Sequence, residues 1–207
     1  MRAPPYRIVT ERLVVRCWEP ADAPLLKEAV DSSLDHLRPW MPWAHEAPVP
    51  VGQTVELLRG FRGRFDLGQD FVHGILSRDE SEVIGGSGLH TRAGADAFEI
   101  GYWIRASRSG EGLGTEVAAA LTRVGLELAG ARRIEIRVDP ENVASLAIPR
   151  KLGFVEEGRL RVVLHGPDGT PMQRDAVVFS LLADELAGSP AGAVSLEAFD
   201  AGGARLS

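Results

Sequence analysis

A turn with glycines at three alternate positions lies between a predicted strand and a predicted helix, and it constrains the fold more than any other feature. Its sequence is Arg108-Ser109-Gly110-Glu111-Gly112-Leu113-Gly114-Thr115. Alternate glycines let backbone N–H groups face outward at the positive end of the following helix, a geometry that binds phosphate. The spacing matches neither GxxxxGK(S/T) nor GxGxxG, so P-loop and Rossmann nucleotide sites are not indicated. Taken alone, such a turn is equally consistent with a purely structural role.

Four segments before this turn have the alternating apolar pattern of half-buried strands. The first is Arg12–Trp18, and Phe71–Arg78, Glu82–Thr91 and Ala97–Arg105 follow later in the chain. Short polar turns separate the last three, which predicts an antiparallel meander.

The region between the first strand and the meander contains two predicted helices and a proline-rich segment. Asp22 is a plausible N-cap for the first helix, and apolar spacing predicts a second helix over Thr54–Phe65 that stops near Gly68. Residues 35–50 hold four prolines together with Trp40 and Trp43, which indicates an ordered loop.

The segment after the glycine-rich turn predicts a βαβ unit followed by two more strands. These elements are a helix at Val117–Leu128, a strand at Arg133–Asp139, a helix at Asn142–Leu152, and strands at Phe154–Leu164 and Asp175–Leu181, joined by a turn at Gly166–Gly169. The whole pattern predicts an α+β fold, with a mixed, mostly antiparallel sheet of about seven strands flanked by about four helices.

Charge and cysteine content exclude several classes of function. The formal net charge of −6 is the wrong sign for a broad nucleic-acid or anionic-lipid surface. The single cysteine, Cys17, lies on an apolar strand face, which favours a core role, and together with scattered histidines it gives no metal-site spacing. No signal-peptide pattern or long apolar run is present. We therefore expect a cytoplasmic protein without metal, nucleic-acid or membrane partners.

Two domain-level segments are expected from composition. Residues 1–186 carry every recognisable element, whereas residues 187–207 are rich in alanine, glycine and serine and resemble a C-terminal tail. Apolar residues such as Val194 and Phe199 leave open whether this tail docks on the body or on another subunit. A homodimer is a further expectation.

Several motifs together closely resemble the GNAT superfamily of N-acetyltransferases. They are Glu99–Ile104 before the glycine-rich turn, Asn142–Ser145 and Lys151–Phe154. Leu37–Trp43 and Arg174–Val177 are similar to the RimJ/RimL-like branch, which acetylates N-termini of ribosomal proteins. The resemblance implies a fold in which acetyl-CoA lies in a cleft where the fourth and fifth strands splay apart.

The resemblance also implies which residues hold the donor. Backbone groups of Trp103, Ile104 and Arg105 are expected to bind pantetheine like an added strand. The remaining expected cofactor residues are Arg108, Ser109, Gly110, Glu111, Gly112, Leu113, Gly114, Thr115, Asn142 and Ser145. The chain departs from the family's usual Gln/Arg-x-x-Gly-x-Gly/Ala pattern, because Ser109 takes the first position and Glu111 stands where a basic residue is common. Both changes are expected to weaken donor binding, and Arg108 next to them is expected to compensate in part.

Acyl transfer to an amine requires a neutral nucleophile, a stabilised carbonyl oxygen and a proton for the departing thiolate. By resemblance, the Ile104 N–H binds the thioester carbonyl and Ser145 is the proton donor. Many relatives have a tyrosine at the position matching Pro149, so its absence here favours Ser145. The alternative is that Ser145 only begins a helix.

Two residues are candidates for the general base. Glu99 is the first choice because strand alternation places it with Gly101 and Trp103 on one face, which is the face of the expected cofactor cleft. His90 is the rival, since imidazole changes charge near neutral pH. Trp40 and Trp43 are expected to bind the acceptor, with ordinary packing as the alternative.

The sequence leads us to expect an acetyl-CoA-dependent N-acetyltransferase acting by direct transfer in a ternary complex. Its acceptor is a peptide N-terminal amine or a small-molecule amine. The alternatives are a CoA-binding sensor without turnover and a transferase that uses another donor such as succinyl-CoA.

Overall fold

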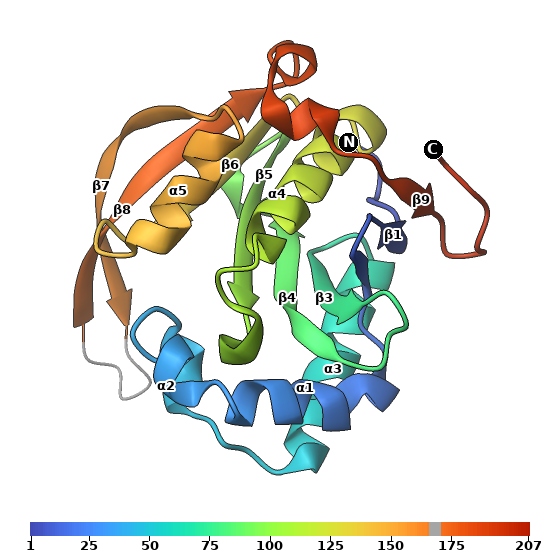
Figure 1. Cartoon of the computed structure of the whole chain (residues 1–207), viewed down its shortest axis with the longest axis vertical. Helices are drawn as coiled ribbons and strands as arrows, with labels where there is room; N and C mark the ends of the chain where they lie inside the picture. Colours follow the sequence, from blue (N-terminus) through green and yellow to red (C-terminus); the bar gives the residue numbers. More distant parts are fainter. Residues whose placement is uncertain (166–170) are drawn as a thin grey trace.

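Nine strands form one sheet in the order β7-β8-β6-β5-β4-β3-β2-β1-β9 (Figure 1). This computed structural model describes residues 1–165 and 171–207, so the turn expected at Gly166–Gly169 lies outside the described residues. The strands are β1 (Arg7–Val9), β2 (Leu13–Cys17), β3 (Phe71–Ser77), β4 (Val83–His90), β5 (Ala97–Ile104), β6 (Arg133–Val138), β7 (Val155–His165), β8 (Pro171–Leu182) and β9 (Glu197–Phe199). Adjacent strands are antiparallel except β5 and β6, which confirms the mixed sheet.

The expected helices are present, with one short addition. They are α1 (Ala23–Asp31), α2 (Leu34–Leu37), α3 (Val51–Asp66), α4 (Leu113–Arg123) and α5 (Val143–Lys151). The addition is α2, which lies at the start of the proline-rich segment. Asp22 does occupy the N-cap position of α1, but its carboxylate accepts from the Glu19 N–H and from Arg16 instead of capping the helix. No helix in the described part of the chain has the length and apolarity to cross a bilayer.

Alternation along the strands divides the core between the two faces of the sheet. On one face, Phe98 and Ile100 of β5 pack with Val117 and Leu121 of α4. On the other face, side chains of β2, β3 and β4 pack against α1 and α3; this second cluster includes Val14, Trp18, Leu76, Leu26 and Leu58. Trp103 of β5 packs against this second cluster, so the β5 side chains reach both layers.

The parallel pairing of β5 with β6 covers only part of their length. It runs from the Ala97/Arg133 pair to the Ile100/Ile136 pair and then stops. Residues 101–104 continue β5 beyond that point without a partner on the β6 side. The splayed pair predicted as the fourth and fifth strands is thus confirmed, and the labels shift by one because β1 precedes it.

The two short strands at the edge of the sheet were not predicted from the sequence. Both β1 and β9 have three residues, which is too few to show a period of two. They pair with each other through Ile8 and Ala198, so residues from the expected tail extend the sheet. Two alanines of the expected tail, Ala191 and Ala198, are fully buried.

We expect Ala191→Asp to lower the free energy of unfolding by about 3 kcal/mol, because it places an unpaired charge in a site with no solvent exposure. Ser195→Asp, at an exposed position of the same segment, is the matched control. Urea denaturation measures both variants. Equal stability of the two would mean that residues 187–207 are detached from the body in solution.

Candidate active site

The unpaired end of β5 presents backbone groups to the gap beside β6. The Arg105 N–H donates to the Ile84 carbonyl at 2.8 Å, and the register places Ile104 opposite Gly85. Because antiparallel hydrogen bonding alternates, the peptide groups of Trp103 and Arg105 face β4, whereas those of Tyr102 and Ile104 face the gap. An extended ligand can therefore add to β5 there as a strand would.

This geometry supports the expectation that the Ile104 N–H faces the bound donor. It differs from the expectation that backbone groups of Trp103 and Arg105 bind pantetheine, because those groups face β4. The Arg105 guanidinium is also engaged, since it lies 2.7 Å from Glu28 and 3.1 Å from Glu82 in a nearly buried position. Arg105 thus ties β5 to α1 and β4. The sequence could not reveal this because both carboxylates are distant along the chain.

The glycine-rich turn has the backbone that its sequence predicts. Gly110 and Gly112 have φ of 83° and 79°, in the left-handed region that favours glycine, and Gly112 is the N-cap of α4. The first N–H groups of a helix have no intrahelical partner and remain available to an anion. A Cβ at Gly114 would lie 3.1 Å from Ile148 of α5, so this glycine permits the close approach of the two helices. The cradle therefore fits a pyrophosphate.

The charges around this cradle are already paired with one another. Arg108 lies 2.9 Å from Glu111 and 2.8 Å from Glu82, and Arg12 donates to the Glu111 carbonyl. The hydrogen bond from Arg108 lowers the pKa of the exposed Glu111. A phosphate group that uses Arg108 must compete with these two carboxylates.

A cavity of about 850 Å³ brings the remaining candidates together. It reaches Tyr102 and Ser145 on the α4 side of the sheet and Trp18 and Leu26 on the α1 side, so it passes through the β5–β6 gap. The expected site residues that line it are Trp40, Trp43, His90, Glu99, Trp103, Asn142 and Ser145.

Ser145 lies in the first turn of α5, as the helix-start alternative has it, and its hydroxyl makes a further contact. Asn142 is the N-cap of α5, and its side chain accepts from the Ser145 N–H at 3.0 Å. The Ser145 hydroxyl lies 3.0 Å from the Tyr102 hydroxyl, which also donates to the Ser145 carbonyl at 3.4 Å. That carbonyl lacks its helical donor because Pro149 has no N–H.

Tyr102 is a site residue that sequence reasoning missed. Strand alternation assigned it to the face opposite Glu99, and this is correct, but nothing in the sequence showed that α5 would place Ser145 beside it. Burial raises the pKa of Tyr102 to about 12, so its hydroxyl remains protonated at neutral pH. A phenol is therefore present next to Ser145 even though none occurs at position 149.

The two candidate bases are opposite one another on β4 and β5 but differ in their partners. Glu99 is only 7% exposed and lies 2.5 Å from Arg92 and 3.6 Å from Arg137, which occupy its oxygens. His90 contacts a single carboxylate, that of Asp70. The geometry therefore favours His90 over Glu99, which was the first choice from sequence.

Aromatic side chains form the wall of the cavity on the α1 side. Trp43 and Trp103 meet edge to face with ring centroids 5.8 Å apart. Arg174 holds the preceding loop by donating to the Pro39 carbonyl at 2.5 Å while pairing with Asp139 at 2.9 Å. The segment that carries Trp40 and Trp43 is thus held by β8, which lies on the far side of the gap.

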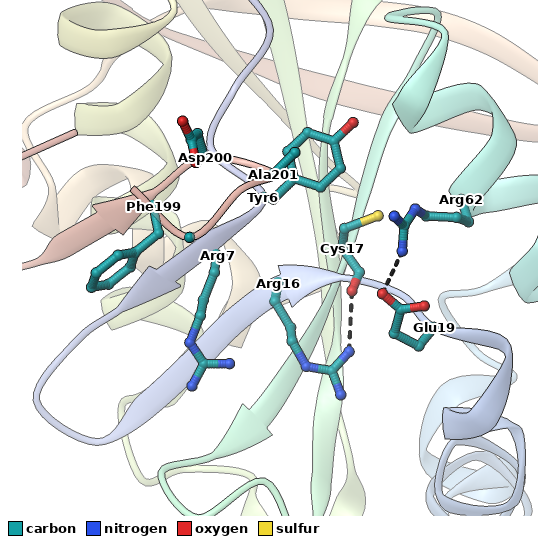
Figure 2. Close-up of a pocket in the computed structure, with 10 residues that line it drawn as sticks. Tyr6, Arg7, Arg16, Cys17, Glu19, Arg62, Phe199, Asp200 and Ala201 are labelled. Carbon is teal, nitrogen blue, oxygen red and sulfur yellow. Dashed lines mark hydrogen bonds and ion pairs between the residues drawn. The ribbon is translucent and has the colours of Figure 1, made fainter. Parts of the chain in front are cut away.

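A second cavity, of about 420 Å³, lies between β1, β2 and the C-terminal segment (Figure 2). None of the expected site residues lines it, whereas Cys17 does. Burial raises the pKa of Cys17 to about 12, so the thiol is not ionised, in keeping with its expected core role. Among the residues that the structure describes, no group of three or more His, Cys, Asp or Glu side chains is arranged to hold a metal ion.

The splayed strands, the glycine cradle and the shared cavity define an acyl-CoA-dependent transferase, and the chain belongs to the GNAT acetyltransferases. The family model for the acetyltransferase (GNAT) domain matches residues 12–155. The enzyme therefore uses acetyl-CoA as its donor.

Individual relatives agree with this assignment. The chain is 31% identical over 159 residues to the ribosomal protein uS5 alanine N-acetyltransferase of Escherichia coli (strain K12), covering 75% of this chain and 81% of that protein. The solved structure of Mycobacterium smegmatis RimJ in complex with CoA-disulfide has a TM-score of 0.79 and 28% identity, covering 93% and 95%. The self-immunity acetyltransferase MccE, solved with acetyl-CoA and AMP, shares the fold with a TM-score of 0.73 at 17% identity, covering 83% and 93%.

We expect Glu111→Gln to raise the affinity for acetyl-CoA about three- to fivefold, because it removes a negative charge from the phosphate cradle and frees Arg108. Calorimetric titration measures the change. Glu127→Gln, which removes a similar exposed pair with Arg123 at the other end of the helix, should leave the affinity unchanged. Equal affinities for Glu111→Gln and wild type would mean that Arg108 does not contact the donor.

Proposed function

We propose that this acetyltransferase acetylates the α-amine of a peptide N-terminus by direct transfer in a ternary complex. The observation that carries the proposal is the cavity, which joins the strand gap on the α4 side to the aromatic wall on the α1 side. Donor and acceptor can approach each other in this cavity from opposite faces of the sheet. Relatives named as ribosomal N-acetyltransferases support a peptide acceptor.

Acetyl-CoA, when bound, supplies a thioester whose carbonyl carbon accepts the amine. The Ile104 N–H faces the gap and is the proposed donor to the carbonyl oxygen. Ser145 is the proposed proton donor to the departing sulfur, and Tyr102 holds its hydroxyl. The buried thiol of Cys17 lies outside this cavity, so a covalent acyl-enzyme at that residue is not part of the proposal.

The acceptor amine must lose a proton, and His90 is the proposed base. An α-amine has a pKa of about 7.7 to 8.0, against about 10.4 for a lysine side chain. One imidazole is therefore sufficient for an α-amine at neutral pH, whereas a lysine side chain is almost wholly protonated and needs a stronger base. This difference favours peptide N-termini over lysine side chains as acceptors.

A thiol-release assay tests the proposal directly. Acetyl-CoA and succinyl-CoA are each offered with N-terminal peptides, blocked peptides that contain lysine, and small amines, while calorimetry measures donor binding. We expect turnover with acetyl-CoA and free N-terminal peptides. Turnover confined to small amines would contradict the peptide proposal, and donor binding without turnover would indicate a CoA-binding sensor.

We expect Ser145→Ala to lower kcat by about 10²-fold and to leave KM for acetyl-CoA nearly unchanged, because the hydroxyl acts on the departing thiolate rather than in binding. Steady-state kinetics with the preferred peptide gives both parameters. Ser81→Ala, at an exposed turn between β3 and β4, is the control. Near-normal turnover of Ser145→Ala would leave Ser145 with a helical role only.

A further inference from the structure

We propose that Asp70 is a positioning residue that fixes the tautomer of His90, so that Nε2 is the unprotonated nitrogen in the cavity. The inference rests on the proposed function and extends it to a residue outside the sheet. Asp70 lies in the loop between α3 and β3, and its two carboxylate oxygens are 3.0 and 3.2 Å from His90 Nδ1. Both residues line the 850 Å³ cavity.

A carboxylate can only accept hydrogen bonds, so a neutral imidazole beside it carries its proton on Nδ1. The lone pair is then on Nε2. Burial is the largest single effect on Asp70 and acts to raise its pKa, but the hydrogen bond from His90 and the nearby positive charges together outweigh it, so the pKa is lowered. Asp70 therefore stays ionised and continues to accept from Nδ1 at neutral pH.

Two glycines create the space in which the ring lies. Gly88 of β4 and Gly101 of β5 are register partners on the face that lines the cavity. A Cβ at Gly88 would be 2.9 Å from His90 Nε2, whereas a Cβ at Gly101 would be 3.5 Å from it. The imidazole thus lies over a shallow trough between the two strands, and a side chain at position 88 would displace it.

The charged and titratable groups around this pair lie on several elements and leave the pairing intact. Arg64 of α3 and Arg92 after β4 act on Asp70 through space. Glu99 of β5 is opposite His90 but is held by Arg92 and Arg137. His73 of β3 is buried, and burial lowers its pKa to about 4, so it is neutral at pH 7.

In the described part of the chain no hydrogen bond occupies His90 Nε2, so this nitrogen is open to an acceptor amine. The amine binds in its neutral form, and as its nitrogen bonds to the acetyl carbon and the carbon–sulfur bond breaks, the one proton that this nitrogen loses passes to Nε2. Asp70 stabilises the imidazolium that results. The sulfur receives its proton from Ser145, and exchange with water returns both side chains to their starting states.

The test combines a spectroscopic measurement with kinetics. Nitrogen-15 NMR of the imidazole ring, recorded on the full-length protein without ligands, reports which nitrogen of His90 carries the proton. We expect the Nδ1–H tautomer in wild type. In Asp70→Asn the amide can donate to Nδ1, so we expect a shift toward Nε2–H and a fall in kcat of about 10- to 100-fold at unchanged KM for acetyl-CoA.

Matched variants separate positioning from a general structural effect. Asp79→Asn, in an exposed turn, should change neither the tautomer nor kcat. Gly88→Ala should displace the ring and lower kcat while Asp70 is intact, whereas Gly101→Ala should keep the wild-type NMR signature because its Cβ makes only ordinary contact. If Asp70→Asn does not fold, the Gly88→Ala and Gly101→Ala pair still tests the ring position.

Three outcomes overturn the proposal. The first is an Nε2–H tautomer of His90 in wild type. The second is a normal kcat in Asp70→Asn although the tautomer has shifted. The third is a wild-type kcat in Gly88→Ala although the ring of His90 is displaced. Failure of the proposed function is distinguishable, because wild type would then bind acetyl-CoA and acetylate no peptide. That result would remove the catalytic role of His90 and, with it, the role of Asp70.

Discussion

The structure depends on the point at which the β5–β6 ladder ends. Beyond Ile100 and Ile136 the peptide groups of β5 that face β6 have no strand to pair with, and backbone groups away from bulk water need a partner. The helices that follow these two strands, α4 and α5, meet closely at Gly114 and Ile148. A fold that leaves this ladder incomplete has a site for an extended ligand built into its backbone.

A single strand supplies both sides of the reaction centre because its side chains alternate. Tyr102 extends toward α5 and contacts Ser145, whereas Gly101 leaves room on the opposite face for the ring of His90. The group that serves the leaving thiolate and the group that serves the amine are therefore separated by the thickness of β5. Their relative position is fixed by the pleat, which is more rigid than a loop.

Short-range patterns in the sequence were sufficient for the main strands and helices, and the family resemblance located the gap. Neither the sequence patterns nor the resemblance predicted which side chains would pair with the candidate catalytic groups. Glu99 ranked first as a base because of its residue type and face, but the pairing with Arg92 and Arg137 is tertiary. Asp70 is twenty residues from His90 in the chain, and no periodicity connects them. Such pairs depend on how loops return to the sheet, which spacing alone does not encode.

The C-terminal segment has a consequence for association between molecules. β9 is the last strand at its edge, and an open edge is a template for strands of other chains. Here the backbone of Ala198 is already paired on its outer side, since Leu206 donates to its carbonyl at 2.7 Å and its N–H donates to Ser207. The chain thus folds back to close its own sheet, and edge-to-edge aggregation at this border first requires residues 205–207 to detach.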